Sequence, residues 1–322
     1  MNSLKRLLLY IREWMRMNRI AKDPAFAQER RRSVLIRLVH AIEKGLSLAE
    51  PRPGFGLQKL EKLWTLCAAY EKDYGDGAYC LRMATDAVAA YMAYHASIGY
   101  QSPEIASLAE RFSALAARLE PAPEAQQAGG VQTVTTPDAF PISALLRQRH
   151  SVREFTGEPV PRAAIERAVC NAQACPSACN RQAVRVYSLP AAKLLELYDS
   201  NLSGIGGFAE AADRFLLVTG KISAYDAGEV NQFVVSAGMF ASYLTLTLME
   251  EGVGSCIVQR PLQDSKSHRR ICAHCGIPAD EQIVLMMAVG GLKQTYRAPV
   301  SGRFPTEEIL RFCDEPKGEN AI

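Results

Sequence analysis

A polar stretch near the middle of the chain divides the sequence into two parts with different patterns. This stretch, "EPAPEAQQAGGVQTVTTPD" at residues 120–138, contains Pro, Gln, Gly and Thr and has little to bury, as is usual for linkers. We therefore expect one domain over residues 1–120, a linker over 121–138 and a second domain over 139–322. A length of 322 residues agrees with about two domains of roughly 150 residues each.

The first part shows helical periodicity almost throughout. Apolar residues recur three and four positions apart within residues 57–74, 80–97 and 104–120, which predicts an all-α N-terminal domain. Residues 40–56, "HAIEKGLSLAEPRPGFG", contain enough Gly and Pro to indicate an ordered loop between two of the helices.

The first twenty residues predict an amphipathic basic helix. Its apolar positions are Leu4, Leu7, Leu8, Ile11 and Met15, and Lys and Arg residues surround them. Such a helix suits peripheral contact with a membrane surface, but we favour docking onto the chain's own domain. No apolar run approaches the roughly 18 residues that span a bilayer. Nine cysteines without an export signal favour reduced thiols and a cytoplasmic location.

After the linker, strand patterns alternate with helical ones, which predicts an α/β or α+β domain. Helices are expected at residues 140–148, 161–174, 191–200, 228–251 and 265–275, and strands at 183–189, 214–220, 255–259 and 282–291.

Two segments of this part carry polar side chains suited to a ligand with a phosphate and a heterocycle. "RQRHSVREF" places Arg149, Ser151 and Arg153 just beyond an apolar helix, and an Arg guanidinium is a planar fork of donors that suits phosphate. A helix C-terminus, whose dipole favours cations, explains these residues equally well. In "ACPSACNRQ", the amides of Asn180 and Gln182 can donate and accept hydrogen bonds, although such residues also form ordinary turns.

Four motifs in order resemble the nitroreductase family. "RQRHSVREF", "CPSACNRQ", "GVGSC" with "AVGG", and "RFP" follow the family's basic-Ser-x-basic opening, its Pro-Ser-x-x-Asn-x-Gln loop and its Arg close to a Pro near the C-terminus. The resemblance extends from about Phe140 to Ile309. It implies an α+β fold with a central mixed or antiparallel sheet flanked by helices, a homodimer, and FMN held at the dimer interface.

The same resemblance implies roles for individual residues. Arg149, Ser151 and Arg303 resemble the phosphate ligands of FMN, with His150 beside them. Arg153 corresponds to a basic residue near flavin N1 and O2, where its charge would stabilise the reduced flavin, and no other catalytic side chain is implied. Further cofactor-binding residues are Pro176, Ser177 and Asn180, which reach the flavin bound chiefly by the other subunit, with Gln182 supporting their loop, and Gln259, Pro261 and Leu262, which present backbone groups to the ring.

The chain also departs from the family pattern. Some members have an Asn and a Lys before the second strand, but this chain reads "NLSGIGGFAEAADRF" there and offers only Asn201, so the pyrimidine edge of the ring has no assigned partner. The N-terminal part, with "HAIEKGLS" and "RPGFG", is similar to the helical extension of nitroreductase-like proteins encoded near polysaccharide genes.

Two clusters of Cys and His residues are weaker candidates for a binding site. The first cysteine cluster (Cys170, Cys175, Cys179) and the second cluster (His268, Cys272, His274, Cys275) have types and spacings that zinc or an iron–sulfur cluster could use. We expect no metal, because Cys170 falls on the apolar side of a helix and no second C-x2-C pair completes a site. A net charge of +3, with no aromatic stacking pattern, argues against nucleic acid.

The leading hypothesis is an FMN-dependent oxidoreductase. Hydride from NADH or NADPH would pass through the flavin to an electron-poor acceptor, such as a nitro compound, a quinone or an activated alkene. A non-catalytic flavin-binding or scaffold protein in surface-polysaccharide assembly would keep the same ligands and remains open. We further expect the "RPGFG" loop to roof the active site, and a chain beginning near Thr136 to bind FMN and dimerise by itself.

Overall fold

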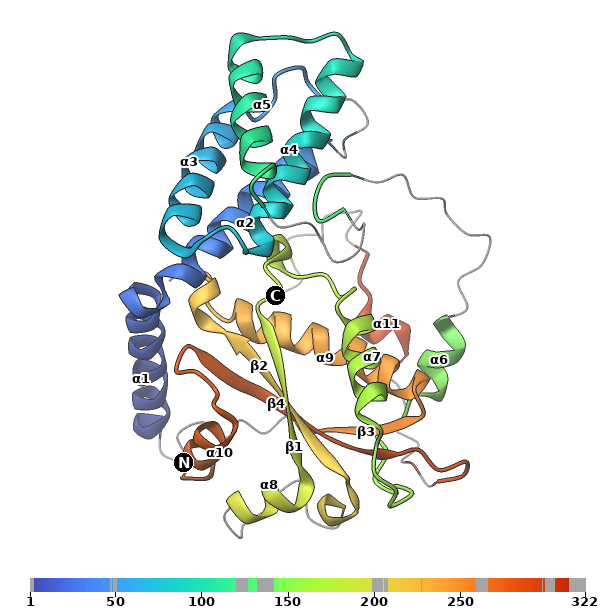
Figure 1. Cartoon of the computed structure of the whole chain (residues 1–322). Helices are drawn as coiled ribbons and strands as arrows, with labels where there is room; N and C mark the ends of the chain where they lie inside the picture. Colours follow the sequence, from blue (N-terminus) through green and yellow to red (C-terminus); the bar gives the residue numbers. More distant parts are fainter. Residues whose placement is uncertain are drawn as a thin grey trace, which may run out of the picture.

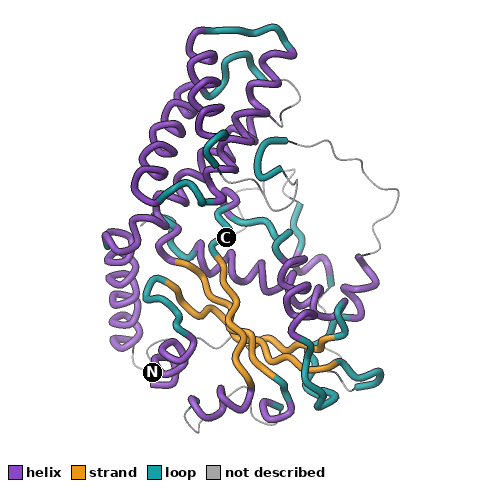
Figure 2. Tube along the Cα trace, in the orientation of Figure 1, coloured by secondary structure: helices purple, strands orange, loops and turns teal. Residues whose placement is uncertain are grey.

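The computed structural model describes a helical part and a four-stranded sheet with helices on both of its faces (Figure 1, Figure 2). The described residues are 3–46, 48, 51–119, 127–131, 142–198, 205, 208–226, 228–258, 266–296, 298 and 305–312. The fold is α+β, as expected from the sequence.

The N-terminal part is all-α, which confirms the prediction from its periodicity. Its elements are α1 (Ser3–Lys22), η1 (Pro24–Phe26), α2 (Ala27–Leu46), α3 (Leu57–Tyr74), α4 (Tyr79–Ser97) and α5 (Pro103–Ala116). Helices α2 to α5 each bury one apolar face in a shared core that includes Leu35, Leu60 and Tyr91. The start of α5 has an N-cap, because the Ser102 hydroxyl accepts a hydrogen bond from the Ile105 amide at 3.2 Å.

The loop expected over residues 40–56 is shorter than predicted, because residues 40–46 complete α2. The "RPGFG" segment packs against the core of the helical part through the partly buried Phe55. The Tyr91 hydroxyl donates to the Phe55 carbonyl at 2.8 Å, and buried His95 accepts the Gly54 amide at Nε2 at 2.9 Å. A Cβ at Gly45 would lie 2.1 Å from the Phe55 ring, so this glycine allows the loop to pack on α2. Gly and Pro here mark tight packing within the helical part.

The second part contains an antiparallel sheet in the order β1-β2-β4-β3. Its elements are α6 (Ile142–Gln148), α7 (Arg162–Ala172), η2 (Ala178–Asn180), β1 (Val184–Pro190), α8 (Ala191–Leu197), η3 (Ala209–Ala211), β2 (Arg214–Lys221), η4 (Ile222–Ala224), α9 (Gln232–Glu250), β3 (Val253–Val258), α10 (Lys266–Cys275), β4 (Glu281–Gly291) and α11 (Thr306–Ile309). The strands and helices expected from the sequence are all present, with ends that differ by a few residues.

Alternate residues of the central strands supply two separate cores. Leu216 and Val218 of β2 pack with α7 and α9, whereas Phe215 and Leu217 pack with α8 and α10 on the other face. This two-sided burial explains why β2 is an unbroken apolar run although its sheet is antiparallel. One described helix, α9, is long and apolar enough to span a membrane by length and composition alone, but one of its faces packs on the sheet as a core helix does.

The helical part packs directly against the second part. Ile20 of α1 joins a buried cluster with Ile222, Tyr225 and Phe233. Two ion pairs cross the same junction: Glu29 with Lys221 at 3.1 Å, and Arg37 with Asp226 at 2.8 Å. Helix α2 also contacts η2 and η4. The packing therefore ties the helical part to the segments that precede β1 and follow β2.

Candidate functional site

The basic motif follows α6 and continues along the edge of the sheet. The Val152 amide donates to the Ser255 carbonyl of β3 at 2.9 Å, and Phe155 forms a bridge with Leu292 beyond β4. Val152 is buried, while Arg149, His150 and Ser151 are half-buried and Arg153 is exposed. The segment therefore anchors itself by its apolar residues and presents its basic residues and hydroxyl outward.

The glycines of "GVGSC" and "AVGG" make room for this segment. A Cβ at Gly254 would lie 2.8 Å from Val152 Cγ1, and one at Gly290 would lie 2.6 Å from the Phe155 ring. Real Cβ atoms do not approach so closely, so these positions need glycine. The two glycine motifs thus position the basic motif, which gives a physical reason for their occurrence together.

Arg153 has a neighbour that the sequence did not suggest. Its guanidinium lies over the ring of Phe208, 5.7 Å from the ring centroid, and one of its nitrogens lies 3.5 Å from the Ser151 carbonyl. Burial raises the pKa of the Cys256 thiol on β3, and the charge of Arg153 offsets part of that rise. Phe208 falls in the segment where the family pattern departs, and a cation–π contact fixes the direction of an otherwise exposed arginine.

The loop before β1 holds an unusual backbone conformation. Cys179, Asn180 and Gln182 have φ angles of 52°, 53° and 51°, in the left-handed region that residues other than glycine rarely adopt. The Ser177 hydroxyl accepts the Gln182 amide at 3.0 Å, and the Gln182 side chain donates to Asn180 Oδ1 at 3.3 Å. Strain of this kind persists only where its surroundings impose it, and it concentrates at ligand-binding sites.

Arg181 anchors this loop to the interior of the protein, and the sequence did not identify this role. Its side chain is 2% exposed and donates two hydrogen bonds to Glu229, at 2.7 and 2.8 Å. The guanidinium also lies over the Tyr225 ring, 4.8 Å from its centroid. Burial raises the pKa of Glu229, but the hydrogen bonds and charge of Arg181, together with a hydrogen bond from the Asp226 amide, leave the pKa below its usual value. Arg181 therefore points into the protein while its neighbours face outward.

The two motifs lie at diagonally opposite corners of the sheet. The loop leads into β1, where Val184 pairs with Gly220 and Gly220 with Gln282 at the start of β4. The basic segment joins β3 at Ser255, which pairs with Val289 near the end of β4. Four strands span about 14 Å, and the seven steps along β4 from Gln282 to Val289 span about 23 Å of strand. The strand ends that lead to the two groups of one chain are thus roughly 20 Å or more apart by this geometry.

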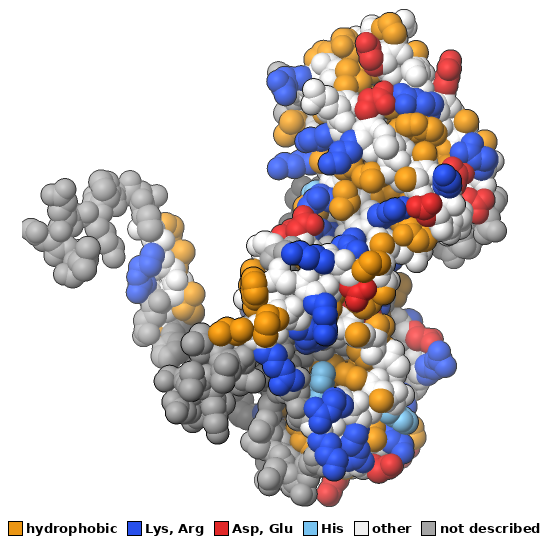
Figure 3. All heavy atoms as spheres, turned by 90° about the vertical axis from the view of Figure 1, so that its left-hand side faces the viewer, with side chains coloured by type: hydrophobic (Ala, Val, Ile, Leu, Met, Phe, Trp, Pro, Cys, Tyr) orange, Lys and Arg blue, Asp and Glu red, His pale blue; other side chains and the backbone are white. Residues whose placement is uncertain are grey.

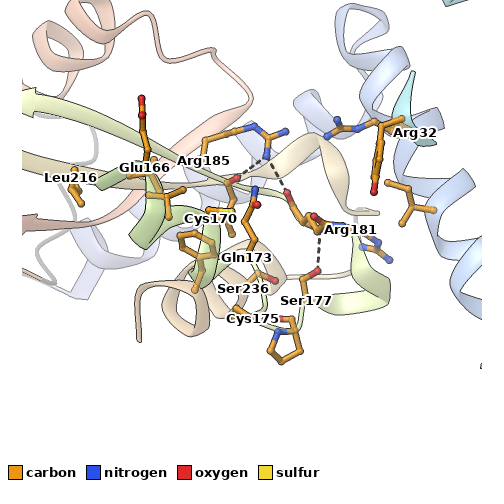
Figure 4. A pocket seen from close by; sticks show the side chains of 18 of the residues that line it. Arg32, Glu166, Cys170, Gln173, Cys175, Ser177, Arg181, Arg185, Leu216 and Ser236 are labelled. Atoms are coloured by element: carbon orange, nitrogen blue, oxygen red, sulfur yellow. Dashed lines mark hydrogen bonds between the residues drawn. The ribbon is translucent and has the colours of Figure 1, made fainter. Parts of the chain in front are cut away.

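A cavity of about 1050 Å³ lies between the helical part and the second part. The loop borders it through Pro176, Ser177 and Gln182. Figure 4 shows the guanidinium groups of Arg185, from β1, and Arg32, from α2, extending into it from opposite sides. The other residues that line it from the helical part are Ile36, Tyr70, Ala78, Tyr79, Cys80 and Met83.

The cavity changes two interpretations made from the sequence. The described residues of "RPGFG" do not line it; the roof consists of α2, the end of α3 and the start of α4. Cys170 does not lie on the apolar side of α7, because the buried stripe runs through Ala164, Ile165 and Ala168, and Cys170 is exposed and borders the cavity. In the second cluster, the Cys272 thiol lies 3.4 Å from His268 Nε2. The described residues contain no group of three or more potential metal ligands.

Four of the expected cofactor ligands, Gln259, Pro261, Leu262 and Arg303, lie outside the described residues. Of the others, Arg149, His150, Ser151 and Arg153 lie together at one corner of the sheet, and Pro176, Ser177, Asn180 and Gln182 lie together at the other. The structure therefore brings the residues together in two groups.

Comparison with known proteins finds a family match for the second part of the chain. A sequence model described as "Nitroreductase family" matches residues 146–213 and 207–291. No curated protein matches the chain. A nitroreductase-like family protein from Bacillus cereus is 16% identical, with a TM-score of 0.45, and the match covers 56% of this chain and all of that one.

Two further solved structures are similar to the same extent. The FMN-dependent nitroreductase of Clostridium difficile is 18% identical over 53% of this chain and 98% of its own, with a TM-score of 0.44. A nitroreductase from Desulfovibrio desulfuricans, solved with FMN, is 21% identical over 56% of this chain and 99% of its own, with a TM-score of 0.43. The family match therefore covers the second part of the chain, and an additional helical part precedes the matched residues.

Proposed function

We propose that the chain is a homodimeric FMN-dependent oxidoreductase. The donor set fits FMN, because Arg149 and Ser151 offer a charge-assisted and a hydroxyl contact for one phosphate, and Arg153 offers a cation for the ring. At the other corner, the strained loop presents Ser177 and Asn180 from a fixed backbone. Arg303 would complete the phosphate site.

The observation that carries this proposal is the separation of the two groups. One FMN cannot reach two corners of a sheet that are roughly 20 Å or more apart by the strand geometry given above. A twofold dimer removes this difficulty, because it can place the loop of one subunit beside the basic segment of the other. The twofold symmetry then produces two such sites. An exposed apolar stripe on α9, with Val235, Met239 and Tyr243 between 39% and 52% exposed, supports the existence of such an interface.

Each group of residues would have a distinct task. Bound FMN would supply hydride chemistry between NADH or NADPH and an electron-poor acceptor such as a nitro compound, a quinone or an activated alkene. Arg149 and Ser151 would hold the phosphate, and Arg153, directed by Phe208, would stabilise negative charge at the pyrimidine edge. The interdomain cavity beside Pro176 and Ser177 would admit the acceptor, so the helical part would contribute to the choice of substrate.

A non-catalytic flavin-binding or scaffold role would use the same ligands. The experiment that separates the two is to purify the full chain, record its absorbance, and identify any released cofactor by mass. Anaerobic NADH or NADPH is then added. We expect a yellow protein that releases FMN and loses its absorbance with one of the two donors. Yellow protein that neither donor bleaches would support the scaffold, and FAD or no flavin would overturn the proposal.

A further inference from the structure

Helix α1 has two apolar faces, and among the described residues only one of them packs against the rest of the protein. Met17 and Ile20 point toward the second part, where Ile20 is 3% exposed in a cluster with Ile222 and Tyr225. On the same side, Arg16 donates to Gln282 Oε1 at 3.1 Å. This side fixes the helix to the protein, as expected from the sequence.

The other side carries large apolar groups in solvent. Ile11, Trp14 and Met15 are 42%, 59% and 52% exposed, and their spacing of three and four residues places them on one face. Single exposed apolar residues are ordinary, but an adjacent group with a tryptophan marks an interaction surface. In the sequence, Leu4, Leu7 and Leu8 continue the same spacing toward the N-terminus.

Positive charge accompanies this apolar face. The sequence of α1 contains Lys5, Arg6, Arg12, Arg16, Arg19 and Lys22 against the single acid Glu13. The Arg19 and Lys22 side chains are exposed. Helix α10, which lies beside α1, adds exposed Lys266 and Arg269, and Figure 3 shows Lys and Arg side chains gathered over this face of the molecule.

We propose that α1 binds the surface of a membrane rich in anionic lipid, with Ile11, Trp14 and Met15 in the interface and its cations toward the headgroups. An apolar stripe beside a basic stripe, with an exposed Trp, is the pattern of helices that lie in the plane of a membrane. A second copy of α1 fits this face less well, because the excess of Lys and Arg on each helix would repel the same excess on the other. The interaction requires no flavin, so it stands independently of the proposed function.

Trp14 provides a direct probe of this interaction. The other tryptophan, Trp64, packs in the helical core against Phe112, with ring centroids 5.4 Å apart, and Trp64→Phe leaves Trp14 as the single reporter. The full chain with this change is mixed with vesicles of phosphatidylcholine alone or with about one third phosphatidylserine. We expect a blue shift of the Trp14 emission and co-sedimentation with the anionic vesicles, both reversed by high salt.

Variants separate the electrostatic and the apolar contributions to membrane binding. Arg19→Gln with Lys22→Gln is expected to lower partitioning about tenfold or more, because each cation near an anionic surface contributes on the order of 1 kcal/mol. Ile11→Ser with Met15→Ser is expected to abolish the blue shift. Matched controls are Lys59→Gln with Lys62→Gln on α3, and Phe312→Ser near the end of the chain, all at exposed positions. These controls should bind as the parent does.

Three results would overturn the proposal. One is an unchanged Trp14 spectrum with anionic vesicles, and another is equal binding to both kinds of vesicle. The third is a blue shift that grows with protein concentration when lipid is absent, which would assign the face to a second copy of the chain. Circular dichroism of each variant confirms that the helices remain folded.

Discussion

At the scale of single residues, Arg181 connects the strained loop of the candidate site to the protein interior. It is flanked by Asn180 and Gln182, whose backbones are left-handed, and its buried guanidinium forms an ion pair with Glu229, whose side chain is 30% exposed. Removal of one partner from such a pair leaves an unpaired buried charge and costs about 3 kcal/mol or more. We expect Glu229→Gln to destabilise the protein by this order and to weaken FMN retention, although Glu229 belongs to neither group of expected ligands. Urea unfolding and flavin content measure the two effects, and an unaltered flavin content would separate the loop from the cofactor.

The same pair predicts a dependence on pH. The folded-state pKa of Glu229 is lowered, so its contribution to stability is present above the unfolded pKa and is lost as the pH falls through the folded value. We therefore expect the stabilities of the wild type and Glu229→Gln to differ most near neutral pH and to converge in acid. Curves that stay parallel down to acid pH would show that the carboxylate charge contributes little.

Arg149 allows a test of the phosphate assignment. A charge-assisted hydrogen bond contributes about 1.5 to 3 kcal/mol, so Arg149→Ala should weaken FMN binding about tenfold or more. Arg147, an exposed neighbour in the last turn of α6, provides the matched control, and Arg147→Ala should change little. Titration of the apo-protein with FMN measures both variants. Equal losses would assign the effect to general charge and not to a specific contact.

At the scale of elements, local patterns predict much of the fold. Apolar residues spaced three and four positions apart identified the helices, and apolar runs bounded by turns identified all four strands. These patterns arise because the buried face of a helix or strand recurs at a fixed spacing. The motif order also predicted the family. The same patterns could not show that residues 40–46 continue α2, because Gly45 is tolerated there by packing against Phe55. Nor could they pair Arg181 with Glu229 or Arg153 with Phe208, since only the tertiary fold brings these residues together.

The exposed face of helix α9 predicts how the proposed dimer can be broken. Met239 and Tyr243 are exposed on one face of this helix, and the opposite face packs on the sheet through Ala237 and Leu244. We expect Met239→Glu to weaken the dimer and to release FMN, because a charge would be buried at the interface without a partner. Sedimentation with absorbance detection follows mass and flavin together. A flavin-loaded monomer would contradict the shared site.

At the scale of the whole molecule, the junction between the two parts changes the expected behaviour of a truncated chain. The sequence alone predicts that a chain beginning near Thr136 retains FMN. The structure shows that removal of the helical part would expose Ile222, Tyr225 and Phe233, which pack against Ile20. We now expect the truncated chain to lose stability and to hold FMN more weakly than the full chain. A soluble truncated dimer with full flavin content would show that the junction is dispensable.

The placement of the two motifs at opposite corners has a genetic consequence. If each flavin takes its phosphate ligands from one subunit and its loop from the other, two chains damaged in different motifs can complement each other. Arg149→Ala removes the first group, and Asn180→Gly removes the amide of the second while glycine tolerates the φ of 53°. Each chain by itself would form only defective sites. When the two are refolded together, half of the dimers are mixed, and each mixed dimer has one intact site and one doubly damaged site. About a quarter of all sites should therefore recover flavin and turnover, provided that subunits pair at random.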